Sequence, residues 1–313
     1  MSVYTPVERH QLEDFLRHYN LGHLVTYQGI SAGIENTNYF VTTSTGEFVL
    51  TLFEYLGYDE LPYFLELMAY LAEHDMPSAH PLADTEGHYL RQLNGKPAAL
   101  VKRLRGKDVD APNLAQCYAI GYSLGCLHTV GSHFPLHRSN KRGPHWWKIT
   151  AERVLPLMDA DDATLLRTEL DFQANYQGME LPRGVIHADL FRDNALFEDD
   201  TLSGIIDFYY ACNDVLIYDM AITVNDWCSE PDAHLDNKRV QAMFDGYFEN
   251  RELTPLESQA WPVILRAAAL RFWLSRLQDL HFPRPGEITH IKNPAALRNL
   301  LKTHIENQER HLL

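Results

Sequence analysis

The pattern of hydrophobic and polar positions in the first third of the chain predicts a small antiparallel β-sheet flanked by helices. The strand-like segments are 24–28, 38–43, 47–53, 88–93 and 98–104. Ser44-Thr45-Gly46 lies between the second and third segments and has the composition of a hairpin turn. Apolar residues at helical spacing predict one helix that opens with the capping box Thr5-Pro6-Val7-Glu8 and a second helix over 60–73.

The pattern beyond residue 105 is mostly helical. Arg105-Gly106-Lys107-Asp108 is typical of a hinge, and a second capping box at Thr254-Pro255-Leu256-Glu257 opens a late helix within an expected all-helical tail from about residue 216. Three short strands interrupt the helices, at 184–187, 195–198 and 202–207. We therefore expect an α+β protein with two lobes, residues 1–105 and 106–313.

Composition excludes several classes of protein. The chain has 27 basic and 42 acidic residues, a net charge of −15, which argues against a nucleic-acid-binding protein. No apolar stretch approaches the roughly 18 residues of a membrane span, and the start of the chain carries no apolar signal region. Its 4 cysteines include no Cys-x-x-Cys pair and no ligand-spaced cluster with histidine, so we expect a reduced cytoplasmic enzyme without zinc.

Three polar residues among the central strands carry the candidate chemistry. Asp189 and Asn194 lie on a predicted loop between two strands, and Asp207 ends the third strand. Phosphoryl transfer from ATP needs a group that accepts a hydroxyl proton and oxygen-bearing side chains that hold Mg²⁺. We expect Asp189 to be the base and Asn194 and Asp207 to be the metal ligands. The alternative, in which all three only form turns and caps, leaves their joint spacing unexplained.

The run 187–194 resembles the catalytic segment of the aminoglycoside phosphotransferase and choline kinase superfamily, which shares the bilobal architecture of protein kinases. Segments 31–39 and 49–54, taken with 189–194, resemble the homoserine kinases of that superfamily. The resemblance implies ATP and Mg²⁺ as cofactors and L-homoserine, an intermediate of threonine biosynthesis, as the phosphate acceptor. It also implies a sheet-containing amino-terminal lobe and a mainly helical second lobe.

On the nucleotide side, the resemblance places the phosphates beside the loop that begins at Gly33 and the adenine at the hinge. The expected ATP contacts are Gly33, Asn36, Thr37, Asn38, Val49, Lys102, Arg103 and Leu104. Thr51 stands where the superfamily usually has a lysine paired with a helix glutamate, here Glu66. Lys102, Arg103 and Arg192 are the candidate replacements for that cation.

On the acceptor side, an amino-acid substrate requires an arginine for its carboxylate and an acidic or carbonyl group for its ammonium. The expected acceptor contacts are Arg192, Asp226, Trp227 and Arg276, with Arg271 as a further candidate for the carboxylate. His187 and Asp219 are expected to hold the catalytic loop in place.

Two alternatives remain open from the sequence. Another small-molecule kinase, acting on an aminoglycoside, choline or methylthioribose, would share the catalytic loop and differ in its acceptor pocket. A nucleotide-binding protein without transfer activity is suggested only by Thr51 and by the single glycine of the phosphate loop. The sequence is compatible with a homodimer.

Overall fold

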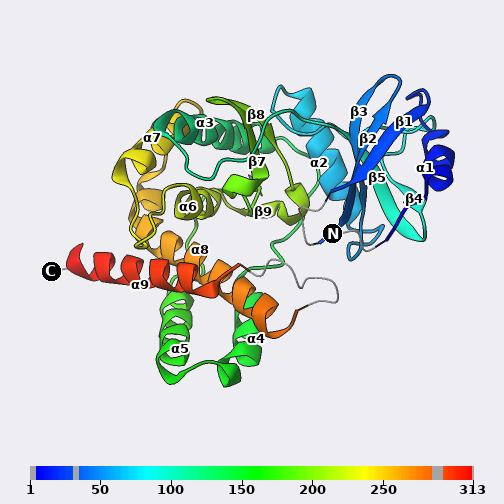
Figure 1. Ribbon diagram of the computed structural model, residues 1–313. Helices are drawn as coiled ribbons and strands as arrows, with labels where there is room; N and C mark the ends of the chain where they lie inside the picture. Colours follow the sequence, from blue (N-terminus) through cyan, green and yellow to red (C-terminus); the bar gives the residue numbers. More distant parts are fainter. Residues whose placement is uncertain (1–4, 31–34, 284–291, 312–313) are drawn as a thin grey trace. The chain divides into compact units, whose positions relative to one another are not determined.

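The computed structural model describes residues 5–30, 35–283 and 292–311 (Figure 1). The chain divides into two compact units. The first contains the described residues up to Gly106 together with Ser203–Ile206, and the second contains the remainder from Lys107 onward. A short central stretch therefore belongs to the first unit, although the surrounding residues belong to the second.

The first unit is built on a five-stranded antiparallel sheet with the order β1-β2-β3-β5-β4. Its strands are β1 Leu24–Gly29, β2 Thr37–Thr43, β3 Gly46–Leu52, β4 Arg91–Leu93 and β5 Lys96–Lys102. The predicted hairpin is confirmed, with Thr43 opposite Gly46. The strand expected over 88–93 begins only at Arg91, because the amides of Glu86 and His88 donate to the Asp84 carboxylate and form a turn there.

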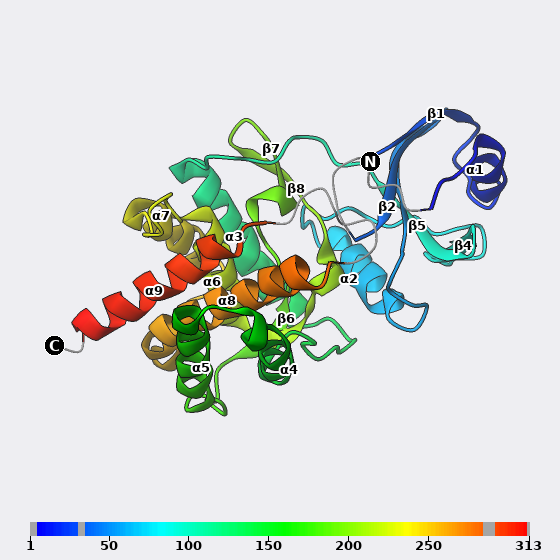
Figure 2. The same ribbon diagram turned by 60° about the horizontal axis from the view of Figure 1, so that its bottom comes forward.

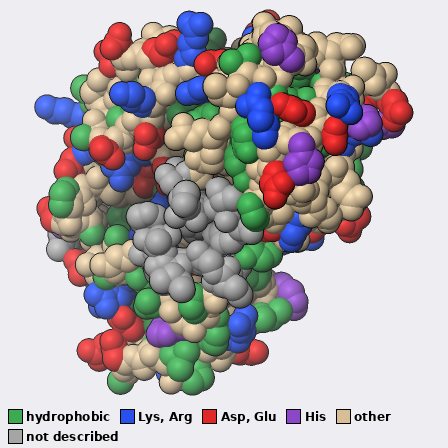
Figure 3. All heavy atoms as spheres, turned by 45° about the vertical axis from the view of Figure 1, so that its right-hand side comes forward, with side chains coloured by type: hydrophobic (Ala, Val, Ile, Leu, Met, Phe, Trp, Pro, Cys, Tyr) green, Lys and Arg blue, Asp and Glu red, His purple; other side chains and the backbone are tan. Residues whose placement is uncertain are grey.

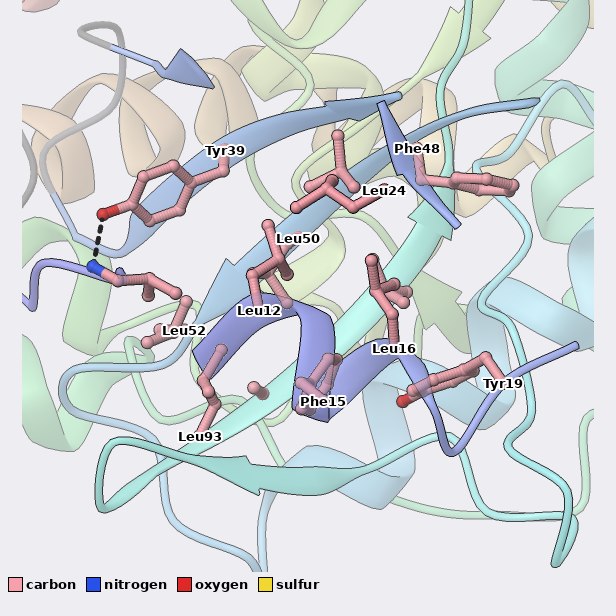
Figure 4. Close-up of a cluster of buried hydrophobic side chains, with 14 residues drawn as sticks. Leu12, Phe15, Leu16, Tyr19, Leu24, Tyr39, Phe48, Leu50, Leu52 and Leu93 are labelled. Carbon is pink, nitrogen blue, oxygen red and sulfur yellow. Dashed lines mark hydrogen bonds between the residues drawn. The ribbon is translucent and has the colours of Figure 1, made fainter. Parts of the chain in front are cut away.

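Helix α1 (Arg9–Leu16) covers one face of this sheet (Figure 4). Leu12, Phe15 and Leu16 pack on Leu50 and its neighbours, and burial of each such side chain contributes roughly 1.5–3 kcal/mol. The predicted capping box at Thr5 is wrong: Glu8 is the N-cap and Gln11 completes the box. The Thr5 amide instead donates to Thr37 Oγ1 at 3.1 Å, which fixes this segment to β2.

Helix α2 (Leu61–Glu73) matches the prediction over 60–73. Apolar side chains surround most of it, and those buried are Leu61, Tyr63, Phe64, Leu65, Leu67, Met68, Ala69 and Leu71. A helix that is apolar on most sides belongs in a protein interior.

The second unit is mainly helical, as expected. Its helices are α3 Leu114–Gly131, α4 Pro144–Val154, α5 Ala160–Ala174, α6 Leu216–Trp227, α7 Asn237–Phe248, α8 Pro255–His281 and α9 Pro294–His311. Short 3₁₀ turns lie at Leu155–Leu157, Arg192–Asn194 and Phe208–Tyr210. Among the helices of the described residues, none is both long and apolar enough to cross a bilayer.

Four short strands lie between these helices along the chain, and the end of one of them belongs to the first unit. They are β6 Arg183–Ile186, β7 Ala195–Glu198, β8 Thr201–Ile205 and β9 Cys212–Val215. β6 pairs antiparallel with β9, and β7 forms a two-stranded sheet with β8. The three strands predicted in this region are therefore confirmed to within two residues at each end. β9 was missed because Asn213 and Asp214, which are disfavoured in strands, lie at its centre.

Helix α8 is the central helix of the second unit and contacts α4, α5, α6 and α9, with α9 alongside it in Figure 2. Its predicted capping box is confirmed: the Glu257 amide donates to Thr254 Oγ1 at 3.2 Å, and the Thr254 amide donates to Glu257 Oε2 at 2.9 Å. Helices α3 and α7 approach closely because Gly121 has no side chain; a Cβ there would lie 1.8 Å from the Met243 carbonyl oxygen. Acidic and basic side chains are interspersed on the face drawn in Figure 3.

Candidate active site

The candidate catalytic loop joins β6 to β7 in the second unit. Asp189 and Asn194 both lie on it, as the sequence predicts, and Asp207 follows β8. Two residues at the site have left-handed backbone conformations, Ala188 with φ 62° and Asp207 with φ 62°. Such conformations are uncommon for residues with a Cβ and persist where surrounding contacts enforce them.

Asp189 is the centre of this site. Asn194 Nδ2 donates to the Asp189 backbone oxygen at 2.8 Å and to Asp189 Oδ2 at 3.2 Å. Arg271 Nη1 lies 3.8 Å from the other carboxylate oxygen, Oδ1. Burial raises the pKa of Asp189 to about 8; Arg271 opposes this shift and the Asp207 carboxylate adds to it. The Asp189 side chain nevertheless keeps 19% of its surface exposed, so a ligand can reach it.

The donor set suits a hard divalent cation. Asp207 is exposed and close enough to raise the pKa of Asp189 by charge repulsion, and Asn194 has its amide nitrogen turned to Asp189, which leaves its Oδ1 as a ligand atom. Mg²⁺ prefers carboxylate and amide oxygens, and a cation among like charges relieves their repulsion. These residues therefore fit the metal that the resemblance implies.

One end of helix α6 holds the start of the catalytic loop. Asp219 is completely buried; its Oδ2 accepts from the His187 amide at 2.7 Å and its Oδ1 accepts from the Ala188 amide at 2.8 Å. His128 Nε2 lies 3.3 Å from the same carboxylate. The His187 ring is also buried, against Phe208, with the Asp189 amide 3.3 Å from its Nδ1. Both His187 and Asp219 thus occupy the loop-holding positions expected of them.

The other end of α6 holds the rest of the loop. Asp226 Oδ2 accepts from the Arg192 amide at 2.8 Å and from Arg192 Nε at 3.1 Å. Trp227 is fully buried and its Nε1 donates to the Leu190 carbonyl at 3.1 Å. The expectation that Trp227 contacts the acceptor is therefore wrong, because its side chain is buried beneath the loop. The spacing of Asp219, Asp226 and Trp227 along one helix was the available signal for this support.

The three candidate arginines differ in their surroundings. Arg192 is held by Asp226 and by the Asp110 carbonyl, so its guanidinium is already engaged in structural contacts. Arg276 Nη1 donates to the Asn293 carbonyl at 3.1 Å. Burial lowers the pKa of Arg276, and the carboxylates of Asp226, Asp193 and Asp189 oppose that shift, which puts Arg276 in the electrostatic neighbourhood of the loop. Arg271 is the nearest of the three to Asp189 among the contacts of the described residues.

The predicted phosphate-binding residues of the first unit are joined by hydrogen bonds. Gly33 lies outside the described residues. Thr37 Oγ1 donates to Glu54 Oε1 at 2.7 Å, and Asn36 Oδ1 accepts from the Glu54 amide at 3.4 Å. Thr51 Oγ1 donates to Asn38 Oδ1 at 2.7 Å. The hydroxyl that stands in place of the usual lysine is therefore bonded to one of the predicted phosphate contacts.

Strand register decides which cations can replace that lysine. Asn38 is opposite Thr51 and Phe40 is opposite Val49, so these side chains share the sheet face away from α1. Lys102 is opposite Phe48, whose side chain belongs to the α1 cluster, so Lys102 faces the wrong side to substitute at Thr51.

Arg103 and the hinge backbone are also partly engaged. The Arg103 guanidinium lies 4.1 Å from the centre of the Phe40 ring, with Nη1 3.6 Å from Glu47. The Lys102 amide donates to the His80 carbonyl at 3.0 Å and the Arg103 amide donates to the Glu47 carbonyl at 3.1 Å. The expected adenine contacts through these two amides are therefore blocked by existing bonds, while Leu104 stays a prediction.

Comparison with known proteins places this geometry in a family. The profile described as "Phosphotransferase enzyme family" matches residues 26–254. The chain belongs to this phosphotransferase family. The homoserine kinase of Methylobacillus flagellatus is 50% identical over 312 residues, which cover 100% of this phosphotransferase and 98% of that enzyme. The homoserine kinase of Neisseria meningitidis is 46% identical over 301 residues, with 96% and 99% covered.

A solved structure is also similar to this phosphotransferase. The amicoumacin kinase hAmiN in complex with AMP-PNP, Ca²⁺ and Ami aligns with a TM-score of 0.74 and covers 96% of this chain and 94% of its own, at 16% sequence identity. At that identity the likeness establishes the fold alone. The kinase-like α+β fold predicted from the sequence is confirmed.

Proposed function

We propose that this phosphotransferase transfers the γ-phosphoryl group of ATP to the side-chain hydroxyl of L-homoserine, giving O-phospho-L-homoserine for threonine biosynthesis. The observation that carries the proposal is the Asp189–Asn194 pair beside Asp207, on a loop held by α6. Relatives that share up to 50% identity over the whole chain carry the name homoserine kinase, which supports the choice of acceptor.

In the proposed reaction the hydroxyl oxygen attacks the γ-phosphorus in line with the departing β-phosphate oxygen. Asp189 accepts the hydroxyl proton, the bond between the γ-phosphorus and the bridging oxygen breaks, and ADP leaves with that oxygen. No phosphoenzyme forms. The hydrogen bonds of Asp219 and Asp226 keep the loop backbone fixed, so that Asp189 needs little rearrangement to meet the hydroxyl.

Asn194 and Asp207 would hold Mg²⁺ in this proposal. When bound, Mg²⁺ neutralises the charge of the phosphates and lowers the repulsion between them and the incoming oxygen. Neutralisation matters here because the chain carries a net charge of −15 and gives ATP no long-range attraction.

The nucleotide and acceptor contacts complete the proposal. Backbone amides and the side chains of Asn36, Thr37 and Asn38 would face the phosphates, and Val49 would pack on the adenine. Arg276 is retained as a contact for the acceptor or the phosphate because of its closeness to the loop carboxylates. A cytoplasmic location and a homodimer also belong to the proposal.

An ADP-release assay with L-homoserine, choline, methylthioribose and kanamycin tests the proposed function. We expect turnover with L-homoserine at least tenfold above any other acceptor, and a phosphomonoester product in the ³¹P NMR spectrum. Higher activity with another acceptor would assign a different small-molecule kinase. ATP binding without transfer to any of them would favour the non-catalytic alternative.

The metal assignment has a separate test. Asp207→Ala should weaken binding of Mg·ATP in calorimetry, since it removes one of the two proposed metal ligands. Unchanged affinity would remove Asp207 from that role.

A further inference from the structure

Arg271 is a buried cation with little to compensate it. Only 4% of its surface is exposed, and no hydrogen bond joins its guanidinium to any described residue. Its contact with Asp189 Oδ1, at 3.8 Å, is too long for a hydrogen bond. Its other contacts are with aromatic rings, 5.2 Å from the centre of Tyr210 and 3.6 Å from that of Phe272. A buried guanidinium is normally paired and hydrogen-bonded, because burying it otherwise is costly.

Arg266, five residues earlier on the same helix, shows what a structural buried arginine looks like here. It is 6% exposed, and its Nε lies 3.2 and 3.1 Å from the two carboxylate oxygens of Glu169. Its Nη1 also donates to Gln308 at 2.8 Å. Arg266 is thus satisfied by protein groups, whereas Arg271, equally buried on α8, keeps its donors for something else.

A second unsatisfied polar group lies on α6, the helix that packs against α8. Tyr218 is 6% exposed, and its hydroxyl has no hydrogen-bond partner in the described structure. Tyr218 is on α6 and Arg271 is on α8, and these two helices pack against each other. Burial raises the pKa of Tyr218, and the charge of Arg271 opposes that shift. Buried donors without partners are rare in folded proteins, and a bound ligand is one group that can complete their hydrogen bonding.

The two carboxylate oxygens of Asp189 face different groups. Oδ2 faces the Asn194 amide on the proposed metal side, and Oδ1 faces Arg271. An acceptor whose hydroxyl is bonded to Oδ1 therefore has the rest of its short chain on the Arg271 side, away from the metal ligands.

We infer that Arg271 and the Tyr218 hydroxyl form the subsite for the α-carboxylate of the acceptor. A guanidinium fork matches a carboxylate with two parallel hydrogen bonds, and the contacts of Arg271 with the Tyr210 and Phe272 rings use no oxygen or nitrogen acceptor. The inference rests on the proposed function and deepens it: the subsite selects amino-acid alcohols over amino alcohols that have no carboxylate. Arg271 takes the carboxylate role that sequence reasoning gave chiefly to Arg192 and Arg276.

The test compares L-homoserine with 3-amino-1-propanol, which has the same skeleton without the carboxylate. In Arg271→Ala, kcat/KM for L-homoserine should fall roughly 30- to 1000-fold, the usual effect of removing one partner of a buried charged pair. Arg271 also opposes the raised pKa of Asp189, so kcat/KM for 3-amino-1-propanol should fall as well, but at least about tenfold less than for L-homoserine. Arg271→Lys keeps the charge but loses the fork, so it should lie between wild type and Arg271→Ala. An equal loss for both acceptors would overturn the subsite, because Arg271 would then act only through Asp189 or the fold.

Binding without turnover provides a second measurement. L-2-Aminobutyrate has the carboxylate and ammonium of the substrate and no hydroxyl, so its affinity by calorimetry should fall in Arg271→Lys and fall about 3- to 10-fold in Tyr218→Phe. Unchanged affinity in Arg271→Lys would contradict the inference.

Arg266→Lys is the matched control. It should lower the melting temperature while preserving the preference for L-homoserine over 3-amino-1-propanol. The two proposals fail differently. If the wild-type protein phosphorylates L-homoserine and Arg271→Ala still prefers L-homoserine to 3-amino-1-propanol as strongly, only the subsite is overturned. Wild-type protein that phosphorylates 3-amino-1-propanol but not L-homoserine overturns the proposed function and the subsite together.

Discussion

The catalytic loop of the second unit and the β2–β3 hairpin of the first unit use polar side chains in different ways. In the loop, two carboxylates of α6, the buried Asp219 and the half-buried Asp226, accept hydrogen bonds from backbone amides at both ends of the loop. In the hairpin, Thr51 donates to Asn38, and Thr37 donates to the carboxylate of Glu54, which also pairs with Lys96 at 2.9 Å. The first arrangement holds the backbone of a loop, and the second joins side chains of the sheet to one another and to an ion pair.

This difference indicates which of the two regions is held by charged hydrogen bonds to its backbone. Hydrogen bonds to ionised acceptors are about twice as strong as neutral ones, so Asp219 and Asp226 can enforce a loop that includes a left-handed Ala188. The hairpin lacks a cation at Thr51, and its register turns Lys102 to the other face. We therefore expect substitutions in the loop and its supports to have much larger effects than substitutions in the hairpin.

The largest effect should come from Asp189→Asn. The variant keeps the shape of the side chain and loses the proton acceptor, so turnover should fall roughly 10²- to 10⁴-fold while ATP binding is largely spared. Single-turnover kinetics and ATP calorimetry measure the two quantities separately. Near-normal turnover would show that Asp189 is not the base, and the loop would then not supply the proton acceptor of the reaction.

Asp219→Asn should have the next largest effect. An amide offers one acceptor oxygen where the carboxylate offers two, so either the His187 or the Ala188 amide is left unpaired in a buried place. We expect a loss of about 2–4 kcal/mol in the free energy of unfolding and a lower kcat with little change in the KM for ATP.

Chemical denaturation of Asp219→Asn measures this loss, with Asp171→Asn as the control. Asp171 is an exposed carboxylate on α5, and its replacement should change stability by less than about 0.5 kcal/mol. If the two variants are equally stable, α6 does not hold the loop through Asp219.

The loop was largely predictable from the sequence, and its support was only partly so. The spacing of Asp189, Asn194 and Asp207 fixes their order on strands and turns, which local patterns reveal. Burial and partners depend on packing between distant segments. Trp227 was therefore assigned to an acceptor pocket, although it is fully buried and bonded to Leu190.

Packing between distant segments also explains why other predictions from the sequence were wrong. Lys102 is near Thr51 in the sheet, but which face it occupies follows from strand register, and a shift of one residue reverses that face. Thr5 has the local signature of a helix cap, yet a hydrogen bond from its amide to Thr37 ties it to β2 instead. Arg271 could be named as a candidate, but only burial without hydrogen bonds distinguishes it from Arg276 and Arg192.

The free energy of unfolding of the second unit should depend on pH through a buried histidine. His304 of α9 is buried with Nε2 2.8 Å from Asn225 Oδ1, at the end of α6 that also holds Arg192. Burial lowers the pKa of His304 to about 4, and Arg266 adds to this. Below the unfolded pKa of about 6.5 the unfolded chain binds a proton at this ring, whereas the folded protein keeps the ring neutral. The free energy of unfolding should therefore fall by on the order of 3 kcal/mol between pH 6.5 and about 4.

Urea denaturation at a series of pH values measures this slope. His304→Gln should flatten it between pH 6.5 and 4, whereas His145→Gln, at an exposed position on α4, should leave it unchanged. An identical slope in His304→Gln would mean that other groups govern the acid sensitivity of the second unit.

The smallest effect should come from Thr51→Val. The change keeps the shape and removes the hydroxyl bonded to Asn38, so it should cost about 1 kcal/mol of stability and raise the KM for ATP less than about threefold. Thr42→Val, on the same face of the hairpin, is the control for the loss of a hydroxyl there. A tenfold or greater rise in KM with Thr51→Val alone would show that the hydroxyl itself orders the phosphate loop through Asn38. A single uncharged hydrogen bond in the first unit would then be as important for the reaction as the α6 carboxylates are in the second unit.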